Sequence, residues 1–372
     1  MPDDETTTSL KAEEPSSSVY DALLAPKRLA ELEQCDKHIQ SYQPTSFWLI
    51  FRLRGRRFDM IAGPLLCLLI WDIGWAVFLL YFDTWSVRDV LQRMNPYLNQ
   101  LLTPVTFLLV FRLGRAAVRY WDARAAAGKM VEVCRTFSST ALVACGGKRN
   151  NHQQYYAEEM ARWIAVFPIA VKNFLRQPRQ GNDEHRIQQI GQVLRDTDRD
   201  ELLSLQGNQR YGPVLVLNRL RQLVFEMTVG SEETDGTDAA SAMLYRQLNE
   251  QLDTLTGAWG AMERIQGTPL PFVYVVHLRT FLLVYLFLMN VQAIAVQGWI
   301  AMPPILLINW GLLGIEAAAV ECESPFKLKS NHLALGKACI VVSKNVAHTM
   351  VHVGLVGPQR EESSFDVLRL DI

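Results

Sequence analysis

The 372-residue sequence has no excess of charge, no regular cysteine spacing and almost no strand-forming pattern. Its 37 basic side chains are balanced by 38 acidic ones, so there is no bulk positive field and nucleic acid is excluded as an expected partner. The six cysteines form no CxxC pair and no zinc-ligand spacing, which predicts buried thiols instead of a disulfide framework. The motifs GxxxxGK(S/T), GxGxxG, GxSxG and HExxH are missing as well. We therefore expect neither an enzyme nor a bound metal or other cofactor.

What the sequence does contain is long apolar runs, since 49% of its residues are hydrophobic and only 20% are charged. A helix needs about 20 residues to cross roughly 30 Å of hydrocarbon. Residues 60–82 carry a single charge and residues 280–315 carry none, which favours membrane spans over buried helices of a large soluble protein. Gly298 and the pair Pro303 and Pro304 predict a turn inside the second run, which makes it two spans.

A fourth apolar stretch, residues 94–111, is short and contains Pro104, so it requires shielding by neighbouring helices. If this stretch also crosses the membrane, the arginine-rich segments lie on the same side. With only three spans they would lie on opposite sides. Lysine and arginine near the span ends then place both termini and the middle of the chain in the cytosol. Residues 1–20 are acidic and resemble neither a signal peptide nor a basic transit peptide, so we expect the plasma membrane over an organelle membrane.

These patterns predict an all-α membrane protein with four transmembrane helices and a large helical cytosolic domain. Apolar positions in the middle of the chain recur at three and four, and runs such as 163–171 are too short to span, so we expect core helices there. The predicted segments are a disordered tail (1–25), a cytosolic N-terminal segment (26–57), transmembrane helices at 58–82, 94–120, 271–299 and 304–320, the cytosolic domain (121–270) and a cytosolic C-terminal segment with a tail (321–372).

Two carboxyl groups lie inside predicted spans, where an ionisable side chain is costly and often functional. For Glu316, a functional role and a place near a helix end that reaches water are both open. For Asp72, the alternative to ion handling is pairing with a polar group on a neighbouring helix. His348 and His352 stand four apart and could share a helix face as metal ligands, but no third ligand is apparent. We interpret that pair as ordinary helix surface.

Thr103, Phe107 and Phe111 are spaced by four, so they fall along one stripe of a helix. Such a stripe is usually core packing. This one lies on the short span and is followed directly by the arginine-dense sequence RLGRAAVRYWDARAAAGK. If several copies of the helix surround an axis, the phenylalanines form a narrow apolar neck that can gate by dewetting. The positive edges of the rings tolerate an anion better than a cation.

Three stretches resemble the bestrophin family of anion channels, most closely its bacterial and algal branch. They are FRLGRAAVRYWDARAAAGKM (111–130), MERIQGTPLPFVYVVHLR (262–279) and VECESPFKLKSNHLAL (320–335). The resemblance implies a homopentamer in a lipid bilayer, with four spans per subunit around one axial pore for chloride, and with bicarbonate or nitrate as further candidates. The alternative is a non-conducting membrane scaffold or auxiliary subunit with the same fold.

The resemblance also implies roles for individual residues. Thr103, Phe107 and Phe111 fall on the neck positions, and Ala242 or Met243 falls on a second, cytosolic constriction. The match fails at one place, because calcium-activated members carry acidic ligands directly after a PFG tripeptide. Here the stretch 327–332 reads KLKSNH, with two cations where carboxylates are required. We therefore expect no animal-type calcium clasp.

Overall fold

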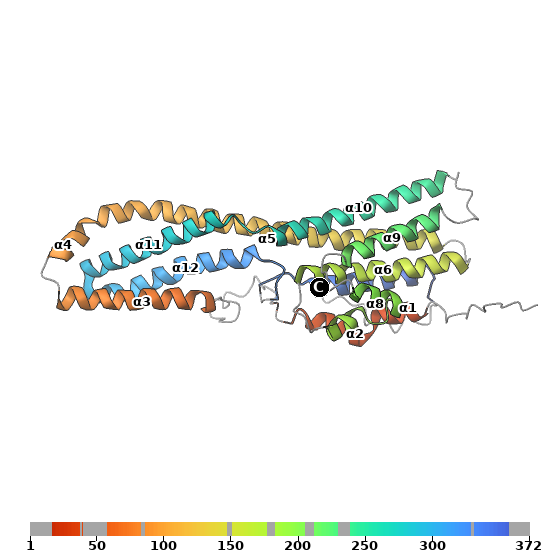
Figure 1. The fold of residues 1–372 in the computed structure, drawn as a ribbon, viewed down its shortest axis with the longest axis horizontal. Coiled ribbons are helices and arrows are strands. Elements are labelled where there is room, and N and C mark those ends of the chain that lie inside the picture. The colour runs from red at the N-terminus through yellow and green to blue at the C-terminus, as the bar shows by residue number, and fades with distance from the viewer. Residues whose placement is uncertain are drawn as a thin grey trace, which may run out of the picture. The chain divides into compact units, whose positions relative to one another are not determined.

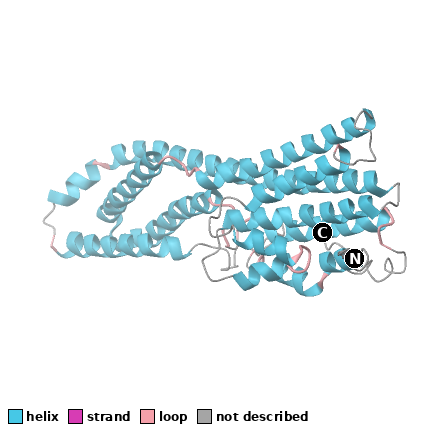
Figure 2. Ribbon diagram, turned by 45° about the vertical axis from the view of Figure 1, so that its right-hand side comes forward, coloured by secondary structure: helices cyan, strands magenta, loops and turns pink. Residues whose placement is uncertain are grey.

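The computed structural model describes residues 17–37, 39, 58–82, 86–146, 151–176, 183–204, 212–229, 239–328 and 331–356. All regular secondary structure within these ranges is helical, which confirms the predicted all-α class (Figure 2). The chain divides into two compact units. The span unit consists of His38–Ala125 and Ala261–Leu333, and the second unit consists of Met1–Lys37, Ala126–Gly260 and Ala334–Ile372.

Among the described residues, three helical segments are long and apolar enough to cross a membrane. The first is α3 (Phe58–Tyr81), and the second is α5 (Asn95–Gly146), which starts in the span unit and continues into the second unit. The third is the 52-residue run Phe272–Glu323, which contains α11 (Phe272–Gln297) and α12 (Met302–Glu323). Figure 1 shows α11 and α12 side by side, so this run folds back on itself.

The fold-back lies where glycine and proline predicted it. Gly298 ends α11 with a φ of 61°, a conformation that favours glycine, and the 3-10 turn Gly298–Ala301 leads into α12. Pro303 and Pro304 lie in the first turn of α12, where a backbone N–H would have no helical partner. The predicted start at residue 304 was therefore two residues late, because these prolines belong to the helix.

The core of the span unit is formed by leucine-rich faces of its helices. Helix α3 packs on both α11 and α12, and the short helix α4 (Ser86–Arg93) packs on α11. Leu68, Leu109, Leu286 and Leu313 are buried members of this core. Large apolar side chains also cover its outside, including Ile300, which is 80% exposed. An apolar exterior of this extent suits lipid or neighbouring copies, and it does not fit the alternative in which these runs are helices buried within one soluble subunit.

The second unit is built around α6 (Asn151–Arg176), which packs on α9 (Gly212–Thr228) and α13 (Leu335–His352). All residues of 163–171 are buried, which confirms that this run is a core helix. Helix α6 is therefore covered on every side over these turns. The remaining helices of the unit are α1 (Ser17–Leu24), α2 (Pro26–Gln34), α7 (Asp183–Ile190), α8 (Asp196–Ser204), the part of α5 from Ala126 onward and most of α10 (Ala239–Gly267).

The predicted disordered tail, residues 1–25, is wrong over its last third. Helix α1 forms there and packs on α6 and α13, with Val19 and Leu23 fully buried. The composition of the whole tail is polar, and that average concealed a short amphipathic helix at its end. Residues 1–16 and the end of the predicted C-terminal tail, 357–372, lie outside the described residues.

Arg28 fixes α2 inside the second unit. Its Nε donates to the carbonyl of Gln189 at 2.8 Å, its Nη1 to the carbonyl of Leu23 at 2.8 Å and its Nη2 to Oγ of Ser343 at 3.1 Å. The side chain is buried, and burial lowers the pKa of Arg28 to about 10. Three neutral acceptors on separate elements satisfy the guanidinium, so this buried cation serves the fold.

Candidate functional site

Within the span unit, helix α5 has a covered face and an open face. Val105, Leu109 and Arg112 are at most 2% exposed, whereas Phe107 is 62% and Phe111 is 48% exposed. Thr103, one turn before Phe107, is exposed as well. The subunit does not use this stripe for its own core, so the interpretation as internal packing does not hold. The stripe is available to another copy, to lipid or to a pore.

The open face of α5 changes from apolar to basic along its length. The rings of Phe107 and Phe111 lie next to each other, with centroids 5.5 Å apart and an interplanar angle of 39°. One turn further on, the guanidinium carbon of Arg115 lies 5.7 Å from the centroid of Phe111, in cation–π range. Arg124 lies over Trp121 in the same way at 5.3 Å. The aromatic stripe therefore leads directly into positive charge.

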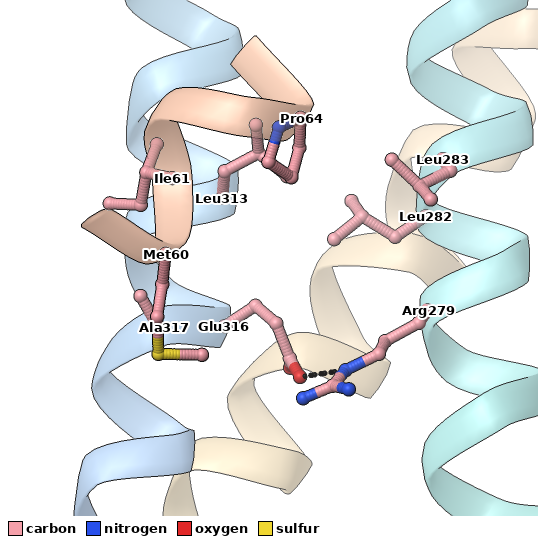
Figure 3. Close-up of a pocket in the computed structure, with 9 residues that line it drawn as sticks. All are labelled: Met60, Ile61, Pro64, Arg279, Leu282, Leu283, Leu313, Glu316 and Ala317. Atoms are coloured by element: carbon pink, nitrogen blue, oxygen red, sulfur yellow. Dashed lines mark hydrogen bonds and ion pairs between the residues drawn. The ribbon is translucent and has the colours of Figure 1, made fainter. Parts of the chain in front are cut away.

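Behind the stripe, α5 is fixed to α12 by buried ion pairs. Arg112 is completely buried, its Nε donates to Oε2 of Glu316 at 2.5 Å, and its Nη1 lies 2.6 Å from Oε1 of Glu323. The other oxygen of Glu316 accepts from Nε of Arg279 on α11 at 2.7 Å (Figure 3). Glu316 is 8% exposed, so it is a junction between three helices and not a helix-end carboxylate in water.

A further arginine extends this network along α5. Arg119 donates from Nε to the carbonyl of Glu323 at 3.1 Å and from Nη2 to the carbonyl of Ile265. The network was missed at the sequence level. The available signal was Glu316 and Glu323, which stand seven apart on one face of α12 and so present two carboxylates to one neighbouring helix.

Asp72 pairs with a polar group on a neighbouring helix. This was one of the two alternatives that the sequence left open for it. Its Oδ2 accepts a hydrogen bond of 3.0 Å from Nδ2 of Asn290, which joins α3 to α11. Asp72 is 2% exposed and Asn290 is fully buried. The pair is therefore enclosed by the helices of the span unit.

The two candidates for the second constriction, Ala242 and Met243, lie near the start of α10 in the second unit. Both are exposed, Met243 by 74%. An exposed methionine at a helix start is compatible with an aperture formed between copies. Their role there stays a prediction.

The stretch expected to lack calcium ligands is partly described. Residues 329 and 330 lie outside the described residues, and Lys327 before them is exposed. Glu321, one of the nearby acids, has its Oε2 3.4 Å from Nε2 of the buried His332. On α13, the rings of His348 and His352 lie 6.3 Å apart. In the part of the chain that the structure describes, no three His, Cys, Asp or Glu residues gather as metal ligands.

The sequence model of a protein family, the bacterial and fungal bestrophin proteins, matches residues 38–348 of this chain. This chain belongs to the bestrophin family. The match contains all three stretches that carried the sequence resemblance and leaves out the two ends of the chain. As a bestrophin with apolar helices long enough to cross a bilayer, it is a membrane protein.

Similar proteins in other organisms carry channel names. A voltage-dependent anion channel-forming protein of Nostoc sp. is 26% identical over 303 residues, which cover 81% of this bestrophin and 90% of the relative. A protein of the same name from Synechocystis sp. is 24% identical and covers 80% and 89% of the two chains.

Solved structures agree with the family in fold. A mutant of a bacterial bestrophin homologue from Klebsiella pneumoniae has a TM-score of 0.63 at 18% identity, and the match covers 78% of this chain and 98% of that chain. Another structure of the Klebsiella pneumoniae homologue has a TM-score of 0.61 at 18% identity. At 18% identity, this structural similarity shows that the chain has the same fold, and it does not show a shared function.

Proposed function

We propose that this bestrophin assembles as a homopentamer and conducts anions across a membrane through a pore lined by α5, without catalysing a reaction. The observation that carries the proposal is the stripe of Thr103, Phe107 and Phe111, which the subunit leaves open while it buries the opposite face of the same helix. The channel names of the relatives support the same function.

Four crossings per subunit fit the helix lengths. Helices α11 and α12 have 26 and 22 residues, about 39 and 33 Å at 1.5 Å per residue, and each exceeds about 30 Å of hydrocarbon. The fold-back between them therefore makes two spans of the third apolar segment. Together with α3 and the first part of α5, this gives four.

In the pentamer, five copies of the stripe would form the neck. Phe107 and Phe111 would provide a constriction that excludes water when closed, and Thr103 would make its outer end wider and wetter. The guanidinium of Arg115 lies against the electron-rich face of Phe111, and the positive ring edges favour an anion over a cation. Arginines that follow on α5 would raise the local anion concentration. We propose chloride as the main ion, with bicarbonate or nitrate as further candidates.

Planar-bilayer recording of the purified full chain tests this function. Wild-type protein should give reversal potentials that favour chloride over potassium, and silence under all conditions would support the non-conducting scaffold instead. The variant Phe107→Ala with Phe111→Ala should raise open probability or relax ion selection. Phe78→Ala is the matched control, because Phe78 is also an exposed phenylalanine, 42% exposed, but lies on α3. Unchanged currents in the double variant would count against the neck.

A further inference from the structure

A pocket of about 210 Å³ lies within the span unit between α3, α11 and α12 (Figure 3). Most of its lining is apolar and two residues are charged, Arg279 and Glu316. The apolar lining residues are Met60, Ile61, Pro64, Leu282, Leu283, Leu313 and Ala317. A largely apolar lining favours an apolar occupant over water.

The charged residues lie at one end of the pocket. Figure 3 shows Arg279 and Glu316 reaching toward each other, with Leu282, Leu283 and Pro64 further along the helices. Leu282 and Leu283 follow Arg279 by three and four residues, which is about one turn, or 5 Å, along α11. The pocket therefore has one polar end and one apolar end, as an amphiphile does.

The depth of Arg279 fits a lipid headgroup. Arg279 lies seven residues after Phe272, the start of α11, so it is about 10 Å along a helix of about 39 Å. Helix α11 is about 9 Å longer than about 30 Å of hydrocarbon, so a placement with this excess at its N-terminal end puts Arg279 near the boundary between acyl chains and headgroups. The apolar end of the pocket then lies in the acyl region.

Among the described residues, Arg279 shares its carboxylate partner with a second arginine. Glu316 shares its two oxygens between Arg279 and the buried Arg112, at 2.7 and 2.5 Å. The network of Arg112, Arg119 and Arg279 with Glu316 and Glu323 thus has three positive charges against two negative charges. The side chain of Arg279 is 45% exposed, compared with 0% for Arg112. An anion that does not belong to the protein can therefore reach the excess positive charge of this network at Arg279.

We propose that this pocket is a binding site for an anionic phospholipid of the surrounding membrane. One acyl chain lies among Leu282, Leu283 and Leu313, and the phosphate pairs with Arg279 at the polar end. Arginine suits this role because its planar fork of N–H donors can meet two phosphate oxygens. The inference requires only membrane insertion, so it does not depend on whether the protein conducts anions.

Native mass spectrometry of the delipidated full chain in detergent tests the site with two probes, dioleoylphosphatidylglycerol and dioleoylphosphatidylcholine. Wild-type protein should retain the anionic lipid about five-fold better, the contribution of one arginine near an anionic surface. Arg279→Gln should remove that preference, and Arg279→Lys should keep most of it. The matched control is Arg93→Gln on α4, whose 79% exposed side chain pairs with Asp89 of the same helix, and it should leave the preference unchanged.

A second variant tests the acyl chain. Leu313→Trp places an indole in the apolar end and should lower retention of both lipids, while thermal unfolding in detergent checks that the variant is folded. Inorganic phosphate, which has no acyl chain, should not raise the unfolding temperature as the anionic lipid does. Equal retention of the two lipids by wild-type protein, an unchanged preference in Arg279→Gln, or equal stabilisation by phosphate would each overturn the proposal.

Discussion

Arg112, the residue directly after Phe111, is fully buried and donates a hydrogen bond of 2.5 Å to Glu316 on α12. Consecutive residues of α5 therefore lie on opposite faces: the ring of Phe111 is on the open face, and the guanidinium of Arg112 is buried and ion-paired. A rotation of α5 that turns Phe111 away must also break this ion pair. The orientation of the proposed neck is thus coupled to the packing of the span unit.

Removing Arg112 should destabilise the protein strongly. Arg112→Met removes the ion-pair partner of Glu323 and one of the two partners of Glu316 behind the stripe, and breaking a buried ion pair costs about 3–5 kcal/mol. Thermal unfolding in detergent should show a clear fall in Tm. Arg93→Met is the matched control, because the 2.6 Å pair of Arg93 with Asp89 is exposed and surface pairs contribute little. Equal Tm values for the two variants would contradict the account.

Asp72 should matter for packing and not for ion selection. Asp72→Ala leaves Nδ2 of Asn290 without its 3.0 Å acceptor, and we expect a loss of about 1 kcal/mol, as for hydrogen bonds between transmembrane helices. The combined change of Asp72→Leu and Asn290→Leu should restore much of the stability, because neither polar group is then left alone. In bilayer recordings, Asp72→Asn should keep the chloride-to-potassium permeability ratio of the wild type. A shifted ratio would instead favour ion handling by Asp72.

Calcium at about 1 µM or below should neither bind nor gate this protein. The segment after Pro325 and Phe326 reads KLKSNH, so it offers lysines where carboxylates are required, and Oε2 of Glu321 lies 3.4 Å from the imidazole of His332. Currents recorded with about 1 µM free calcium, the middle of the range of calcium sensors, should equal those with a chelator. Stoichiometric binding in a calorimetric titration at that concentration would be decisive evidence for a clasp.

The stability of the second unit should fall in alkaline solution through Cys339. Burial raises the pKa of this thiol to about 11, against the lowering effect of Lys172, Arg176 and Arg28 nearby. From about pH 9 to pH 11 the unfolded chain has lost the thiol proton and the folded chain has kept it, so stability decreases with rising pH, by at most about 1.4 kcal/mol per pH unit.

The variant Cys339→Ala isolates this effect. Its Tm should fall less steeply than that of the wild type between pH 8 and pH 10, because the other titrating groups are common to both. Cys67→Ala, on α3 outside the second unit, controls for the loss of a cysteine as such. If Tm fell equally steeply with pH in the wild type and in Cys339→Ala, this thiol would have the same pKa in the folded and the unfolded chain.

The membrane helices and the fold-back could be predicted because their signals are local. Long apolar runs with few charges mark α3 and α11, and Gly298 with Pro303 marks the turn before α12. The stripe through Phe107 and Phe111 could also be found, since spacing by four is a property of one helix. The spacing does not determine whether the stripe faces the core or the outside. That depends on how all helices of the span unit pack.

The missed features depend on contacts between distant parts of the chain. The pair of Arg112 and Glu316 joins residues 204 positions apart, and no pattern within either helix specifies the partner. The pocket above Arg279 has the same origin, because three separate helices line it. Helix α1 was missed for another reason, since it is short and its burial depends on α6 and α13.

The central claim is that the stripe of Thr103, Phe107 and Phe111 lines a pore shared between copies. Single-particle imaging of the purified protein in a lipid nanodisc tests it most directly, because it gives the copy number and the pore lining in one measurement. We predict five subunits with the α5 helices around the axis and with Phe107 and Phe111 of every copy facing it. A map in which these rings face the lipid, or in which no axial pore exists, would contradict the account.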